Sequence, residues 1–257
     1  MPTIKLNGRG LYYAENGAKD SEFTLLFIHG ASSSSAVWTD EIKSLIGCRV
    51  IALDLPGHGR SDPPGRRTVA HYASVVEDFI RTLGPNRPIL VGHSMGSAIA
   101  LTLAHRSVVP VRGLILLGAS ARMPVGTAIL MGAMTDLQKV ASYVAEFGLA
   151  QVTVEWQEEI CRQVIATGGM TTYGDYMACN RFDLRPTLST IGVPALFIAG
   201  RQDNMVPLRF SESTATAMPN ARIVVLDDTG HYAMIEKPQA VLKLVTEFLR
   251  DLAQTTF

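Results

Sequence analysis

A serine stands between two glycines in the stretch ILVGHSMGSAIA, residues 89–100. The pentad from Gly92 to Gly96 reads GHSMG, which has the form G-x-S-x-G, and it directly follows an apolar run. Between a strand and a helix, such a pentad can form a strained turn that lifts the hydroxyl of Ser94 clear of the sheet. A serine hydroxyl alone is a weak nucleophile at neutral pH. The interpretation therefore requires a general base elsewhere in the chain, and an acid that orients this base.

An aspartate and a histidine follow at the ends of two later apolar runs. Asp203 comes three residues after VPALFIAG (193–200), and His231 directly follows ARIVVLDDTG (221–230). The order Ser, Asp, His is typical of triads built on an α/β sheet, where sites form outside the carboxyl ends of the strands. We therefore predict Ser94 as nucleophile, His231 as general base and Asp203 as the acid that orients it.

Acyl transfer also needs two preplaced donors for the negative charge that develops on the carbonyl oxygen. The backbone N–H of Met95, directly after the nucleophile, is one predicted donor. The other is the N–H of Ala31, in the loop that follows the early apolar run TLLFIHG (24–30). Two further side chains, those of Ser32 and Met131, are candidates for contact with the substrate.

The elements that must position these residues can be predicted from periodicity. The stretch IKLNGRGLYYAE (4–15) holds two short alternating runs around Asn7-Gly8, a favoured pair for a tight hairpin turn. Apolar runs are typical of strands buried on both faces of a parallel sheet, and they cover residues 24–30, 48–57, 87–94, 111–120, 193–200 and 221–230. Helical patterns lie between or after them, over 72–84, 95–106 and 240–252. This alternation predicts a doubly wound, mostly parallel α/β sheet.

The alternation stops between residues 122 and 188. This stretch is helical in character, is rich in Met and Ala, and is too long for an ordinary loop. We predict a helical cap over 122–188, inserted into an α/β core that comprises residues 1–121 and 189–257.

Composition excludes several other classes of protein. The chain has 257 residues, 47% of them hydrophobic, and a formal net charge of +0, so nothing favours binding to nucleic acid or to an anionic membrane. No apolar run is long enough to span a membrane, and the N-terminus lacks the apolar segment of a signal peptide. Cys48, Cys161 and Cys179 are widely spaced and odd in number, which favours reduced thiols in the cytoplasm over disulfides or a zinc site. We expect no metal and no cofactor.

Five segments together resemble the α/β-hydrolase superfamily, in its capped, single-domain branch. They are FIHGAS, DLPGHGRSD (54–62), GHSMGS, GRQDNMVP and GHYAMIEKP, and they extend over residues 24–238. The resemblance implies the same triad and the same oxyanion donors, together with a cap that covers the pocket. It also implies that His29 and His58 are structural residues of their loops.

Within this superfamily, a serine in the pentad argues against haloalkane dehalogenases and epoxide hydrolases, which resemble this chain in their loops but carry aspartate there. The favoured function is a carboxylesterase for small or medium acyl esters. The alternatives are an enol-lactone hydrolase, a perhydrolase or a carbon–carbon bond hydrolase, although HGASSS lacks the longer HGGGPG-type loop of the last class. A small-molecule receptor that retains the triad is the non-enzymatic alternative, and repeated turnover would distinguish an enzyme from it.

Simpler interpretations compete for some of these residues. Ser94 and Asp203 could be ordinary turn residues, and His231 could be a capping or core histidine. Asp227 and Asp228 are rival acids, but they lie too near His231 in the sequence to reach its ring easily. The three candidates in the expected order outweigh these interpretations.

Overall fold

One sheet organises the molecule in the computed structural model, which describes residues 2–254. Its strand order is β1-β2-β4-β3-β5-β6-β7-β8. The strands are β1 (Thr3–Leu6), β2 (Arg9–Asn16), β3 (Phe23–Ile28), β4 (Cys48–Leu53), β5 (Ile89–His93), β6 (Gly113–Leu117), β7 (Ala195–Gly200) and β8 (Ala221–Leu226). β1 and β2 run antiparallel, whereas the pairings from β4 through β8 are all parallel. The predicted α/β sheet is thereby confirmed.

The predicted hairpin joins β1 to β2. Asn7 and Gly8 have φ angles of 51° and 79°, in the left-handed region that a tight turn between twisted strands requires. One strand departs from the prediction of burial on both faces: β8 is only partly buried along most of its length. It is the last strand in the sheet order, and within residues 2–254 it pairs with β7 alone.

Helices alternate with the strands after β3. They are α1 (Asp40–Lys43), α2 (Val69–Leu83), α3 (Met95–Arg106), α4 (Thr127–Thr135), α5 (Leu137–Gly148), α6 (Val154–Thr167), α7 (Gly169–Arg181), α8 (Leu208–Thr216), α9 (Ala233–Glu236) and α10 (Pro238–Gln254), with short 3-10 turns at Ser35–Val37 and Arg185–Thr190. α2 begins earlier than periodicity predicts because the hydroxyl of Thr68 accepts the N–H of His71 and caps the helix. None of the helices within residues 2–254 combines the length and apolarity needed to cross a bilayer.

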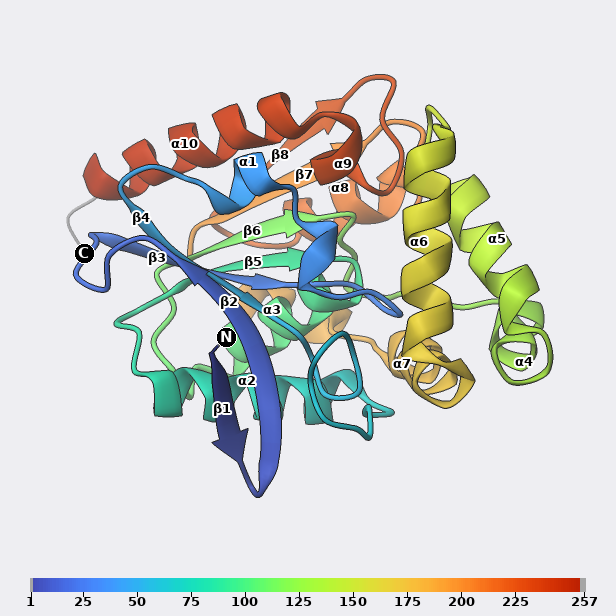
Figure 1. Ribbon diagram of the computed structural model, residues 1–257. Coiled ribbons are helices and arrows are strands. Elements are labelled where there is room, and N and C mark those ends of the chain that lie inside the picture. Colours follow the sequence, from blue (N-terminus) through green and yellow to red (C-terminus); the bar gives the residue numbers. More distant parts are fainter. Residues whose placement is uncertain (1, 255–257) are drawn as a thin grey trace.

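The core lies on both faces of the sheet, as continuous apolar strands require. Along β3, Leu26 and Ile28 face the apolar cluster that includes α2 and α3, while Leu25 and Phe27 face the opposite cluster with α1 and α10. Figure 1 shows the same two layers, with α2 and α3 on one side of the sheet and α1 and α10 on the other. This packing fixes the strand ends from which the site loops project.

The chain between β6 and β7 is helical, and it forms α4 to α7. In Figure 1 these helices, coloured yellow-green to yellow, stand together beside the end of the sheet to which β5 and β6 point. α5 buries a stripe at helical spacing, which includes Val140 and Val144. We call residues 122–188 the α4–α7 segment; its role as a separate cap stays a prediction.

Candidate active site

Ser94 lies in the turn between β5 and α3. Its φ and ψ angles are 52° and −118°, a strained conformation for a residue with a side chain. A Cβ atom at Gly96 would collide with the backbone oxygens of Ile28 and His29, and one at Gly92 would lie 2.5 Å from the oxygen of Gly96. The two glycines are therefore needed for β5, α3 and the end of β3 to approach this closely.

His231 and Asp203 form a buried pair at the ends of neighbouring strands. The Nδ1 atom of His231 lies 2.8 Å from Oδ2 of Asp203. Because a carboxylate only accepts, we assign the proton to Nδ1, which leaves Nε2 free to act as a base. The second carboxylate oxygen accepts the N–H groups of Met205 at 2.9 Å and Val206 at 2.7 Å. These contacts fix the orientation of the carboxylate and, through it, the imidazole.

Ser94 and His231 share the wall of one cavity of about 280 Å³, and Ala31 lies on the same wall. The remaining lining is mostly apolar: Met123, Pro124, Val125, Tyr176, Cys179, Met205, Val206, Pro207 and Phe210, with Arg122 and Asn204 as the polar members. Within residues 2–254, no hydrogen bond joins the Ser94 hydroxyl to the His231 ring. Such bonds commonly tighten only when the substrate is bound.

Two backbone N–H groups beside Ser94 are available as donors. Met95 is the first residue of α3, and the first N–H groups of a helix have no partner within it. The N–H of Ala31 and that of Met95 find no acceptor in the described part of the chain. The helix end also carries partial positive charge, which favours an anion at this position. The role of these two N–H groups as oxyanion donors stays a prediction.

The two side chains predicted to contact substrate lie elsewhere. Ser32 is buried and its backbone N–H points to Asp175, at 2.8 Å from Oδ2. Met131 is 57% exposed on α4. Neither is among the described residues that line the cavity around Ser94, whereas Met123 and Met205 are. Spacing in the sequence could not separate the methionines that face the cavity from those that face solvent.

His93 packs against the ring of His231. Its ring centroid lies 4.7 Å from that of His231, and its Nε2 lies 3.1 Å from the backbone oxygen of His231, to which it donates. Burial, and then repulsion from His231, hold the pKa of His93 well below its ordinary value. His93 therefore stays neutral and adds no second positive charge next to the proposed base.

The α4–α7 segment contacts the loop that carries His231. The N–H of His231 donates to the oxygen of Gly148, the last residue of α5, at 2.7 Å. The carboxylate of Glu236 accepts the N–H of Gly230 and that of Ala150, each at 2.8 Å. Sequence reasoning missed Glu236, because an acid in a short helix gives no indication of the distant loop that it binds.

Within residues 2–254, no cluster of three or more His, Cys, Asp or Glu side chains is arranged to hold a metal ion. What the site does offer is a serine at a strained turn, an oriented histidine and two unpaired N–H groups around one apolar cavity. These are the parts that acyl transfer needs.

Known proteins resemble this chain along almost its whole length. The putative carbamate hydrolase RutD of Pseudomonas savastanoi pv. phaseolicola is 28% identical over 246 residues, which cover 90% of this chain and 94% of that protein. The enol-lactonase from Burkholderia xenovorans LB400 superposes with a TM-score of 0.88 at 25% identity, covering 97% of this chain and 100% of that one. A thermophilic esterase from Thermogutta terrifontis gives a TM-score of 0.81 at 26% identity, with 97% of each chain covered. The model of the alpha/beta hydrolase family matches residues 25–244, and the chain therefore belongs to that family.

Proposed function

We propose that this protein is a serine hydrolase that cleaves carboxylic esters of small to medium acyl chains through an acyl-enzyme intermediate. One observation carries the proposal: His231, hydrogen-bonded to Asp203 at 2.8 Å, lines the same cavity as Ser94. A nucleophile, a base and an orienter held around a cavity are the arrangement that activates a serine. The likeness to an esterase supports the same chemistry.

In the first half-reaction, Nε2 of His231 takes the proton of the Ser94 hydroxyl while Oγ attacks the ester carbonyl carbon. The carbonyl electron pair moves to oxygen, and the N–H groups of Ala31 and Met95 stabilise that oxyanion. As the tetrahedral intermediate collapses, the imidazolium gives its proton to the departing alcohol. Asp203 holds the ring in the required tautomer and stabilises its charged form throughout.

In the second half-reaction, His231 takes a proton from water, which attacks the acyl carbon on Ser94. Collapse of the second tetrahedral intermediate returns the proton to Oγ and releases the carboxylic acid. The same pair of N–H donors serves both intermediates, since the oxygen develops charge at the same position in each.

The cavity supports a preference for modest acyl groups. Its volume of about 280 Å³ lies just below the range of roughly 300–1,000 Å³ for small-molecule sites. Its lining is mainly apolar, and both Met123 and Tyr176 belong to the α4–α7 segment. We therefore also propose that this segment acts as a cap that sets acyl preference.

The test is hydrolysis of p-nitrophenyl esters from acetate to decanoate by the wild type and by Ser94→Ala. We expect many turnovers by the wild type, with the highest kcat/KM among short and medium chains. We expect loss of turnover in Ser94→Ala with an unchanged circular dichroism spectrum. A folded wild type that turns over none of the series, or turns over once and stops, would contradict the esterase and favour a receptor.

Hydrolysis of enol-lactones is the second candidate, and the likeness to an enol-lactonase favours it. The chemistry at Ser94 is the same, but the leaving oxygen stays attached to the acyl group, so one product forms instead of two. Parallel assays with an enol-lactone and with an open-chain ester of the same carbon number would rank the two substrates by kcat/KM.

A further inference from the structure

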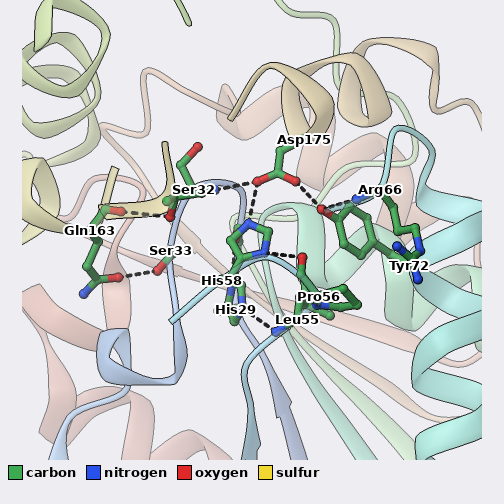
Figure 2. Close-up of polar contacts among 12 residues, drawn as sticks. His29, Ser32, Ser33, Leu55, Pro56, His58, Arg66, Tyr72, Gln163 and Asp175 are labelled. Atoms are coloured by element: carbon green, nitrogen blue, oxygen red, sulfur yellow. Dashed lines mark hydrogen bonds and ion pairs between the residues drawn. The ribbon is translucent and has the colours of Figure 1, made fainter. Parts of the chain in front are cut away.

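A buried carboxylate in α7 lies outside the triad, and the proposed mechanism does not use it. Asp175 has none of its surface exposed. Its Oδ2 atom lies 2.8 Å from the backbone nitrogen of Ser32 and 2.7 Å from Nε2 of His58, and its Oδ1 atom lies 2.6 Å from the hydroxyl of Tyr72. Figure 2 shows these three groups converging on the carboxylate from three different segments of the chain.

The partners of His58 require its ring to carry two protons. Nδ1 lies 3.0 Å from the oxygen of Pro56, which can only accept, and Nε2 faces the Asp175 carboxylate, which also accepts. Burial alone would lower the pKa of His58, but the attraction and hydrogen bond of Asp175 outweigh it and the pKa is raised. The carboxylate is therefore paired with a cation, which compensates its burial far from solvent.

Tyr72 donates the third hydrogen bond to this carboxylate. Its hydroxyl donates to Oδ1 of Asp175 and accepts the N–H of Arg66 at 2.9 Å. Burial, followed by the nearby Asp175 charge, raises the pKa of Tyr72 well above its ordinary value, so the hydroxyl keeps its proton. Oδ1 is thereby bound to α2, whereas Oδ2 faces His58 and Ser32.

Ser32 belongs to the loop that carries the proposed oxyanion donor Ala31. Its φ angle is 54°, in the left-handed region that side chains rarely adopt, so the loop needs outside contacts to hold this shape. The N–H of Ser32 is held by Asp175 of α7, and the hydroxyl of Ser33 donates to Oε1 of Gln163 of α6 at 2.8 Å. Asp175 and Gln163 both belong to the α4–α7 segment. Figure 2 shows that they contact neighbouring residues, Ser32 and Ser33, of one short loop.

We propose that Asp175 is a positioning residue for the oxyanion hole. By accepting the N–H of Ser32, its carboxylate holds the loop in the turn that aims the N–H of Ala31 into the cavity. The seating of α7 on the core and the competence of the oxyanion hole are thereby coupled. This inference rests on the proposed function, since it assigns a task within the same site.

The consequence is a specific kinetic pattern. The oxyanion donors act on charge that exists only in the transition state, so a misplaced donor lowers kcat and leaves substrate binding nearly unchanged. Removal of one donor outright costs about 10²–10³ in kcat. For a donor that is displaced but still present we expect a smaller loss, about 10- to 100-fold.

The test compares Asp175→Asn with Tyr72→Phe on one p-nitrophenyl ester, below the melting temperature of each variant. Asp175→Asn removes the charge and leaves one acceptor oxygen for the three donors of Ser32, His58 and Tyr72, so the Ser32 contact is weakened. Tyr72→Phe removes one hydrogen bond to the other carboxylate oxygen and leaves the Ser32 contact in place. We expect both to lower the melting temperature. Only Asp175→Asn should lose about 10- to 100-fold in kcat, with KM within about threefold of wild type, while Tyr72→Phe keeps kcat within about threefold.

If Asp175→Asn does not fold, Asp175→Glu replaces it. The glutamate keeps the charge that compensates His58 but moves the carboxylate by one methylene, so we expect the same loss in kcat. Wild-type kcat in the Asp175 variant that folds, or an equal loss in Tyr72→Phe, would overturn the proposal. Wild type and Ser94→Ala are assayed first: absence of Ser94-dependent turnover there would overturn the proposed function itself, before any Asp175 variant is compared.

Discussion

Two buried histidine–aspartate pairs lie within residues 2–254, and their N···O distances are almost the same. His231 lies 2.8 Å from Asp203, and His58 lies 2.7 Å from Asp175. They differ at the second ring nitrogen. In His58 both nitrogens are occupied, one by Asp175 and the other by the oxygen of Pro56. In His231, Nδ1 alone has a hydrogen-bond partner within residues 2–254, and the ring lines the cavity that contains Ser94.

The difference indicates what a histidine needs for proton transfer in this fold. A neighbouring carboxylate is not sufficient, since the His58 pair has one and is buried equally well. The ring also needs a free nitrogen that faces the substrate and can take up and return a proton within each cycle. We propose that the His231 pair meets this condition, whereas both ring nitrogens of His58 have acceptors as partners.

The largest expected effect on activity comes from replacing each of the two histidines in turn. His231→Gln removes the base, and we expect kcat/KM to fall by about 10⁵–10⁶, as removal of the base of a serine triad does in other hydrolases. His58→Gln leaves the base intact, so we expect a loss of less than about tenfold together with a lower melting temperature. Steady-state kinetics with one ester and thermal melts of both variants check this. Equal losses of activity would contradict the distinction.

The next largest effect is the loss of kcat when either of the two carboxylates is replaced. Asp203→Asn cannot hold the proton on Nδ1 of His231, and we expect kcat to fall by about 10⁴ because the ring adopts the wrong tautomer. The matched variant Asp175→Asn should lose at most about 10². Single-turnover rates measured side by side at pH 7 would give the ratio. A larger loss for Asp175→Asn than for Asp203→Asn would reverse the roles assigned to the two pairs.

The smallest effect concerns His29, whose ring centroid lies 4.9 Å from that of His58. Burial, and then repulsion from His58, lower the pKa of His29 to about 3. Below its ordinary pKa of about 6.5 the unfolded chain gains a proton at His29 that the folded chain does not, so stability falls as the pH falls. From pH 7 to pH 5 this side chain alone should lower the free energy of unfolding by about 2 kcal/mol.

Urea unfolding of the wild type and His29→Gln at the two pH values checks this. We expect the decline between pH 7 and pH 5 to be about 2 kcal/mol smaller in the variant. An unchanged decline in His29→Gln would mean that His29 is protonated in the folded state.

Much of this architecture could be predicted because its causes are local. Apolar runs fix β3 to β7, and the pair Asn7-Gly8 fixes the hairpin. The order of Ser94, Asp203 and His231 along the chain also predicts which strand ends must converge. The partial exposure of β8 was missed because a run of apolar residues does not reveal which strand ends up at the edge.

The Asp175 network could not be predicted for a different reason. Its members lie 143, 117 and 103 residues from Asp175 in the sequence, at Ser32, His58 and Tyr72. A lone carboxylate on the buried face of α7 is the only indication in the sequence, and periodicity does not identify its partners. Similarly, Ser32 lies in a left-handed turn, and its residue type does not predict that backbone conformation.

The most direct test of the central claim, that Ser94 is the activated nucleophile, is covalent labelling. A p-nitrophenyl alkylphosphonate transfers its phosphonyl group to an activated serine, with release of p-nitrophenol. Intact-mass spectrometry followed by peptide mapping should find one adduct per chain, on the peptide that contains Ser94, and none in Ser94→Ala or His231→Gln. No adduct on the folded wild type, or an adduct on another residue that survives Ser94→Ala, would contradict the account.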